Sequence, residues 1–221
     1  MKTVLMGLSM LLCALGVSAA LTGCTTTCVN GYYGTTCYTT GYYYDSRVSG
    51  LDYETSLDGE VIMSGVTGDD DDPGRFLFIE GATVSFSLGG VNLGETDGKE
   101  RITPFDLAGV AEEAVGGCDV SGALPDDTNA FRRVANLAVL LQTLDTDGDD
   151  TNGIEIRPEV AALFEGITLD VDQASASFEG EASLLSLLDQ ANAEGLFSSD
   201  HELVPRADAL RALYRGVGLC P

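Results

Sequence analysis

The chain separates into a first half with strand-like patterning and a second half with helix-like patterning, and this order restricts its fold. Polar and apolar residues alternate between Val48 and Glu95, as in Thr83–Leu88, where every second side chain would lie on one face of a strand. Gly89 and Gly90 follow, and two glycines between alternating runs favour a hairpin because both can adopt positive φ. Strands followed by helices predict an α+β fold, with a small antiparallel β-sandwich-like module and then a helical subdomain.

Apolar residues three and four positions apart predict helices in the second half. Thr103 and Pro104 provide an N-cap and a first turn for a helix that continues to Gly116. Thr128 caps a stronger helix that ends near Leu144. Further helices are expected over residues 158–166, 184–195 and 205–216.

The residues before the glycine hairpin carry a second strand pattern. Arg75–Ile79 predicts a strand that is buried on both faces. This stretch resembles small β-sandwich modules of secreted bacterial proteins, in which a G-x-F-x-F-like strand leads into a hairpin. The matching positions are Gly74, Phe76, Phe78, Glu80, Gly81, Val84 and Phe86.

The first 23 residues have the layout of a secretory signal. Lys2 is followed by an apolar run over residues 4–17 and by small residues at positions 18–20. The run is shorter than the roughly 20 apolar residues that a membrane-spanning helix needs. We therefore expect residues 1–23 to direct export as a signal peptide.

The end of this leader resembles the lipobox of bacterial lipoproteins. Leu21-Thr22-Gly23-Cys24 matches the box, which implies cleavage by signal peptidase II before a diacylated Cys24. Several acyl chains, such as palmitate, would anchor the protein stably to a lipid bilayer. Thr25, in place of Asp, implies sorting to the outer membrane, with the periplasmic or surface face left open. The alternative is an ordinary signal peptide with an incidental cysteine.

The mature chain is predicted to have three parts. Residues 24–47 form a Thr/Tyr/Gly-rich tether, residues 48–100 a β-rich module, and residues 101–221 a helical subdomain with an Asp-rich loop. Six tyrosines lie within the tether, and they favour a spacer that lies on the domain or the membrane over an aromatic binding patch.

The sequence contains six cysteines, two of which belong to the leader and the lipobox. The other four are Cys28, Cys37, Cys118 and Cys220. Export to an oxidising compartment predicts that they form disulfides, for which three pairings exist. Sequence spacing favours a local Cys28–Cys37 bond and a long-range Cys118–Cys220 bond.

The formal net charge of −24 limits the partners of the protein. Such a surface repels nucleic acid and anionic lipid headgroups, so neither is expected to bind. It can concentrate divalent cations, although adaptation to a saline habitat explains most of the charge without any function.

The strongest candidate for chemistry is the loop over residues 145–156. Aspartates at alternate positions after a helix present hard oxygens to one point, which suits Ca²⁺. The predicted ligands are Asp145, Asp147, Asp149, Asn152 and Glu159. The loop is not an EF-hand, because Asp150 stands where the sharp-turn glycine belongs and Ile156 where a bidentate glutamate belongs. A connection that merely caps the helix is the alternative.

The segment VANLAVLLQTLDTDGDDTNGIEI, which contains this loop, also resembles a segment of uncharacterised bacterial surface lipoproteins. The resemblance implies a recurring module without an assigned activity. Any bound Ca²⁺ is expected to be structural.

No catalytic residues are predicted. His201 is the only histidine, it is expected to be a solvated surface residue, and no G-x-S-x-G motif accompanies it. We therefore expect a non-catalytic binding or structural protein of the cell envelope, with an envelope protein or surface ligand as partner. The alternative is a periplasmic or surface hydrolase that uses carboxylates. Two convergent carboxylates in a pocket would favour the hydrolase, whereas an exposed sheet edge would favour binding.

Overall fold

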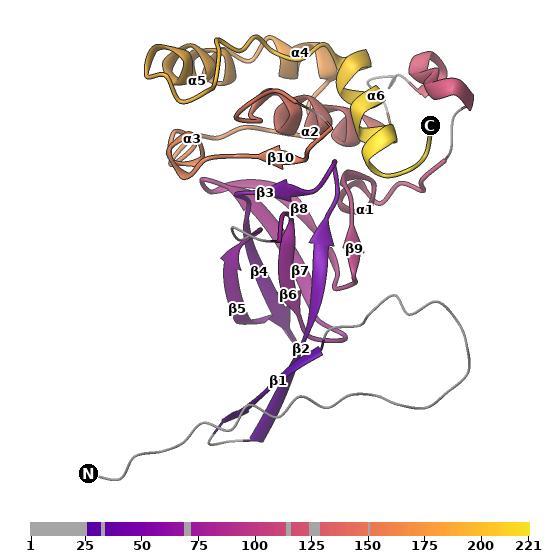
Figure 1. Ribbon diagram of the computed structural model, residues 1–221, viewed down its shortest axis with the longest axis vertical. Coiled ribbons are helices and arrows are strands. Elements are labelled where there is room, and N and C mark those ends of the chain that lie inside the picture. The colour runs from indigo at the N-terminus through magenta and orange to yellow at the C-terminus, as the bar shows by residue number, and fades with distance from the viewer. Residues whose placement is uncertain (1–25, 32–33, 69–71, 114–115, 124–128, 150) are drawn as a thin grey trace.

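The computed structural model describes residues 26–31, 34–68, 72–113, 116–123, 129–149 and 151–221, and it has a β module below a layer of helices (Figure 1). The first sheet contains β1 (Thr26–Gly31), β2 (Gly34–Tyr43), β6 (Arg75–Phe78) and β9 (Arg101–Ile102). The second has the order β5 (Glu60–Val66), β4 (Asp52–Leu57), β7 (Thr83–Leu88), β8 (Val91–Asp97). Strands and helices occupy successive parts of the chain, so the predicted α+β class is confirmed.

Aromatic side chains fill the space between the two sheets. Phe86 of β7 lies with its ring centre 4.9 Å from that of Tyr43 and 5.3 Å from that of Phe76, both in edge-to-face geometry. All three side chains are almost fully buried. Such contacts add to the stabilisation from burying large apolar surface, so these rings hold the sandwich together.

The predicted glycine hairpin is confirmed, and the predicted burial of β6 is wrong. Leu88 pairs with Val91 across Gly89 and Gly90, whose φ values are 54° and 94°. In β6, burial alternates, because Phe76 and Phe78 face the core while the residues between and before them are only half-buried. A strand of an antiparallel sandwich covers the core with one face only.

The tether was predicted to end at residue 47, but the structure places β2 inside the β module. Thr39–Tyr42 pair with β6, and Tyr42 and Tyr43 pair in parallel with β9. Tyr43 is fully buried, and the guanidinium of Arg47 lies 3.8 Å from the centre of the Tyr42 ring. The tyrosines that the structure describes near the end of this segment therefore pack on the domain.

The helices are α1 (Pro104–Ala108), α2 (Phe131–Thr143), α3 (Pro158–Ala162), α4 (Ser175–Glu179), α5 (Ala182–Ala193) and α6 (Arg206–Gly216). Helix α1 is shorter than predicted because Gly109, in the left-handed conformation at φ 64°, ends it. Thr128, the predicted cap of α2, lies outside the described residues. No described helix is long and apolar enough to cross a bilayer.

Helix α2 is the centre of the helical layer, with every residue from Val134 to Thr143 buried. A short parallel pairing joins this layer to the β module. In it, β10 (Ile154–Glu155) bonds to β3 (Val48–Ser49). These β3–β10 and β2–β9 pairings are parallel, unlike the antiparallel strands that were predicted.

Both favoured disulfides are present. Cys28 and Cys37 face one another across the β1–β2 hairpin, and Cys118 is bonded to Cys220, 102 positions later. The second bond ties the chain end to the turn after α1.

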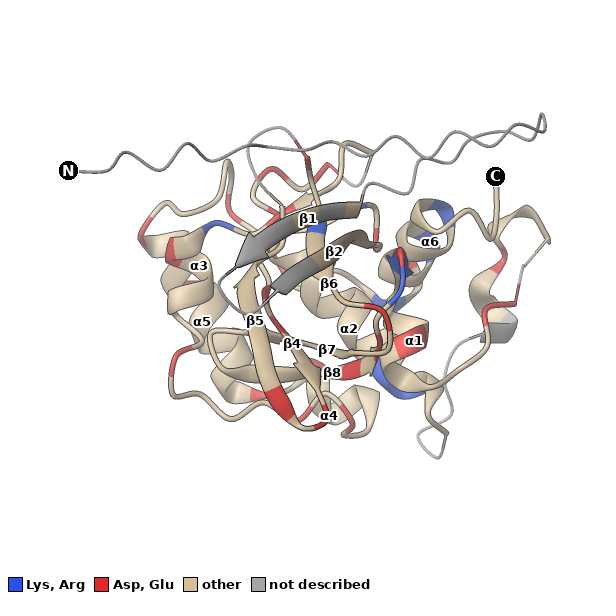
Figure 2. Ribbon diagram, turned by 90° about the horizontal axis from the view of Figure 1, so that it is seen from below, with Lys and Arg blue, Asp and Glu red and all other residues tan. Residues whose placement is uncertain are grey.

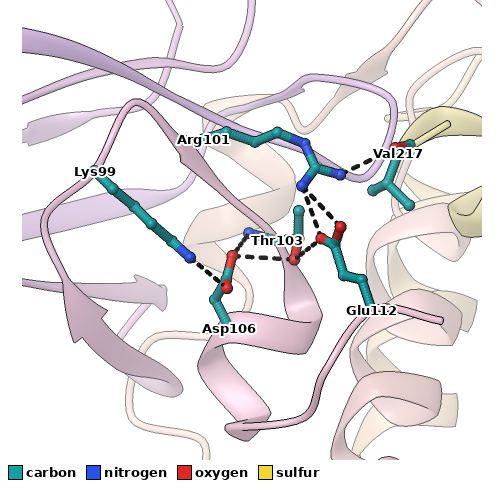
Figure 3. Close-up of polar contacts among 6 residues, drawn as sticks. All are labelled: Lys99, Arg101, Thr103, Asp106, Glu112 and Val217. Carbon is teal, nitrogen blue, oxygen red and sulfur yellow. Dashed lines mark hydrogen bonds and ion pairs between the residues drawn. The ribbon is translucent and has the colours of Figure 1, made fainter. Parts of the chain in front are cut away.

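A polar network reinforces the attachment of the C-terminal region (Figure 3). Arg101 donates two hydrogen bonds to the Glu112 carboxylate, at 2.8 and 2.9 Å, and one to the Val217 carbonyl at 3.0 Å. Beside it, the Asp106 carboxylate accepts the backbone N–H of Thr103 at 2.8 Å and pairs with Lys99. The network links β9 and α1 to the end of α6.

Candidate metal site and adjoining groove

The Asp-rich loop begins directly after α2 and its two ends are bonded together. The Thr146 N–H donates to the Glu155 carbonyl and the Glu155 N–H donates to Asp145 Oδ1, both at 2.9 Å. The Ile154 N–H then donates to the Arg47 carbonyl at 3.0 Å, in the segment that precedes β3. The loop therefore connects the helical layer to the β module.

Asp145 is the most unusual residue of the loop. Its side chain is almost fully buried, and Oδ2 has no hydrogen-bond partner among the described residues. Burial raises the pKa of the Asp145 carboxyl to about 6, with a smaller contribution from the charge of Asp147, against the opposing hydrogen bond from Glu155. A buried carboxylate oxygen without a partner is costly, and a proton or a cation would relieve the cost.

Asp147 supplies a second carboxylate that interacts with that of Asp145. Its Oδ1 accepts the Asp149 N–H at 3.0 Å, and its Oδ2 accepts the Asn152 side-chain amide at 2.9 Å. The Asp149 backbone hydrogen bond, followed by that from Asn152, lowers the pKa of Asp147, so this carboxyl stays ionised. The pair combines one buried and one exposed carboxylate.

The remaining predicted ligands have other partners. Asp149 accepts the backbone N–H of Thr151 at 3.0 Å and its hydroxyl at 2.6 Å, within the loop. Glu159 lies 3.5 Å from Arg157 in an exposed ion pair. In the described part of the chain, no group of three or more His, Cys, Asp or Glu side chains is arranged to hold a metal. The structure thus brings together Asp145, Asp147 and Asn152, and Asp150 lies outside the described residues.

A groove of about 430 Å³ adjoins the loop. Its lining includes Asp147, Gly148 and His201 on one side and Asp208, Arg211 and Arg215 of α6 on the other. The groove carries both signs of charge, and Asp145 is not part of its lining. A molecule in the groove would therefore meet the exposed carboxylate of the pair but not the buried one.

His201 was predicted to be a solvated surface residue, but it is half-buried and its ring packs on neighbouring residues. Its ring stacks on Phe197 with centres 4.1 Å apart, and Nδ1 lies 3.1 Å from the Thr143 carbonyl. Asn192 holds the His201 backbone with two hydrogen bonds of 2.8 Å. At Gly148, where φ is 69°, an added Cβ would lie 3.6 Å from Nε2, so the imidazole faces the Asp loop. Sequence spacing gave no sign of this contact between segments 53 residues apart.

Cys24, the predicted lipidation site, lies outside the described residues. Comparison of the chain with protein-family models, with curated proteins and with solved structures gave no match.

Proposed function

We propose that the protein is a lipid-anchored lipoprotein of the bacterial cell envelope, at the outer membrane, with a non-catalytic binding or structural role. In this proposal Ca²⁺ stabilises its folded domain. The leader and its Leu21–Cys24 box support the anchor, and two disulfides fit an oxidising compartment. The observation that carries the calcium proposal is the buried, unpartnered Oδ2 of Asp145 beside the carboxylate of Asp147.

Ca²⁺ fits this pair of residues by charge and by chemistry. It takes six to eight oxygen ligands, so Asp145 and Asp147 would supply its charged ligands while backbone carbonyls and water would supply the others. A divalent ion would neutralise the repulsion between Asp145 and Asp147 and supply the partner that Oδ2 lacks. The single His201 and the disulfide-bonded cysteines argue against a zinc site.

The position of the pair explains why an ion there would be structural. The loop is hydrogen-bonded to two other segments. Ile154 bonds to the segment before β3, and the Ser198 N–H, in the segment after α5, donates to the Thr146 carbonyl at 2.9 Å. Fixing the loop would therefore stabilise the contact between both layers of the domain.

A hydrolase that uses carboxylates is the second candidate, favoured by one observation. The pKa of Asp145 is raised and that of Asp147 is lowered, as in an acid–base pair, and Asp147 lines a groove. However, a general acid must reach its substrate. Asp145 Oδ2 is buried and does not line the groove, which favours an ion over a substrate.

Thermal melting in the presence of CaCl₂ or EDTA tests the calcium proposal. We expect Ca²⁺ to raise the melting temperature of the wild type and Asp147→Ala to abolish the rise, because binding to the native state alone stabilises it. Asp58→Asn, at an exposed turn position, is the matched control and should respond like the wild type. Equal melting of the wild type with Ca²⁺ and with EDTA would rule out the metal.

A further inference from the structure

Strand β5 is an open edge of the second sheet. It pairs with β4 on one side, and within the described residues no backbone hydrogen bond joins residues 60–66 to any other strand. A bulge at Ile62 interrupts the pairing near the hairpin turn, leaving Met63–Val66 as the regular part of the edge. Unpaired N–H and C=O groups on such an edge can bind another extended chain.

Exposed apolar side chains are concentrated on this edge. The described residues include five exposed large hydrophobic side chains, of which Leu57, Val61, Ile62 and Val66 belong to the β4–β5 hairpin. Val61 and Val66 are 56% and 55% exposed. In the register with β4, Val66 lies opposite Asp52 and Ser64 opposite Glu54, so these four residues share the outer face of the sheet.

The same face is acidic and contains no basic residue. Asp52, Glu54 and Glu95 line a hollow of about 670 Å³ there, with serines from β5 and β7. None of the four strands of this sheet contains Lys or Arg, and the Lys and Arg positions lie on other parts of the ribbon (Figure 2). A ligand that covers this surface must therefore bring its own positive charge.

We propose that an extended, basic segment of a partner protein binds here by adding a strand to β5. Its backbone would bond to the edge at Met63–Val66, its apolar side chains would cover Val61 and Val66, and its Lys or Arg side chains would pair with Asp52 and Glu54. Pairing of two copies of β5 is opposed, because it would bring acidic faces of like charge together. This surface is separate from the Asp loop, so the proposal does not depend on Ca²⁺ or on the lipid anchor.

A fluorescent octapeptide of sequence Lys-Thr-Val-Thr-Lys-Thr-Val-Thr is a suitable probe, because residues two apart share a face and Lys and Val then lie on the same side of the added strand. Its binding to the purified chain is measured by fluorescence anisotropy at low salt. We expect it to bind more tightly than a peptide of equal charge in which proline replaces every threonine, because proline cannot donate the hydrogen bonds of an added strand. NMR of the isotope-labelled chain should show the largest amide shifts at residues 60–66. Equal binding of both peptides, or shifts centred elsewhere, would overturn the proposal.

Two charge-reversal variants distinguish binding to this face from non-specific attraction to the acidic protein as a whole. Glu54→Lys should weaken binding of the Lys-Thr-Val-Thr probe about tenfold, whereas Asp189→Lys, an equal change at an exposed position of α5, should leave it nearly unchanged. Circular dichroism of each variant checks that the fold is retained. Equal weakening by both reversals, or a dimer through β5 seen by sedimentation, would also contradict a basic partner strand.

Discussion

Replacing Asp145 with asparagine should stabilise the protein at neutral pH when calcium is absent. The pKa of Asp145 in the native state is about 6, whereas the ordinary pKa of an aspartate side chain is 3.8. Each pKa unit corresponds to about 1.4 kcal/mol, so the ionised side chain costs the native state up to about 3 kcal/mol. Asparagine removes the charge, keeps an oxygen for the Glu155 N–H, and offers an N–H to the neighbouring carboxylate of Asp147.

The sign of the pH dependence follows from the raised native pKa. Between about pH 4 and pH 6 the native state holds a proton that the unfolded state has released. The free energy of unfolding of the wild type therefore falls as the pH rises through this window. Above it, the contribution of Asp145 to this free energy no longer changes with pH. The asparagine variant lacks this dependence, so the two proteins should differ most at pH 7.5 and least near pH 4.

Differential scanning calorimetry in EDTA at several pH values measures this difference. For a domain of this size 1 kcal/mol corresponds to roughly 2–4 °C, so Asp145→Asn should melt up to about 10 °C above the wild type at pH 7.5. Added Ca²⁺ should reduce the gap by raising only the wild type. Asp58→Asn is again the control. A variant that melts no higher than the wild type in EDTA, or gains equally at pH 4, would refute the reasoning.

Two further predictions concern the cysteines. Cys24→Ser should give a product that is exported without lipid and is released from the membrane fraction, and persistent incorporation of labelled palmitate would contradict the anchor. Replacing Cys118 and Cys220 together by serine should lower the free energy of unfolding in urea by about 2–5 kcal/mol, because their bond closes a long loop. The same change at Cys28 and Cys37 should cost less, since that hairpin loop is short, and equal losses would contradict the argument from loop length.

The parts of the fold that were predicted correctly depend on neighbours in the sequence. The β7–β8 hairpin follows from alternation on both sides of Gly89 and Gly90, and α5 follows from apolar residues at helical spacing before Gly195. Both patterns are stabilised by contacts within one element or one turn. Sequence spacing could therefore identify them.

The errors lie where distant segments meet. The end of β2 resembled a tether because its low-complexity sequence has no alternation, yet β6 and β9 provide strand partners and Phe86 covers Tyr43. The overlong prediction for α1 is an exception with a local cause, because Gly109, directly after the helix, adopts a left-handed conformation. His201 looked solvated because nothing in the sequence indicates that its ring meets the Thr143 carbonyl, 58 positions earlier.

The sequence by itself determined the α+β order, the signal-like pattern of the leader and an Asp-rich loop after an amphipathic helix, since each is a property of local spacing and composition. Only the tertiary structure decided that Asp145 is buried while Asp147 is exposed, and that β5 has a strand neighbour on one side alone within the described part of the chain. Burial and strand pairing depend on which distant segments pack together. Those contacts shift the pKa of Asp145 and leave the acidic edge open.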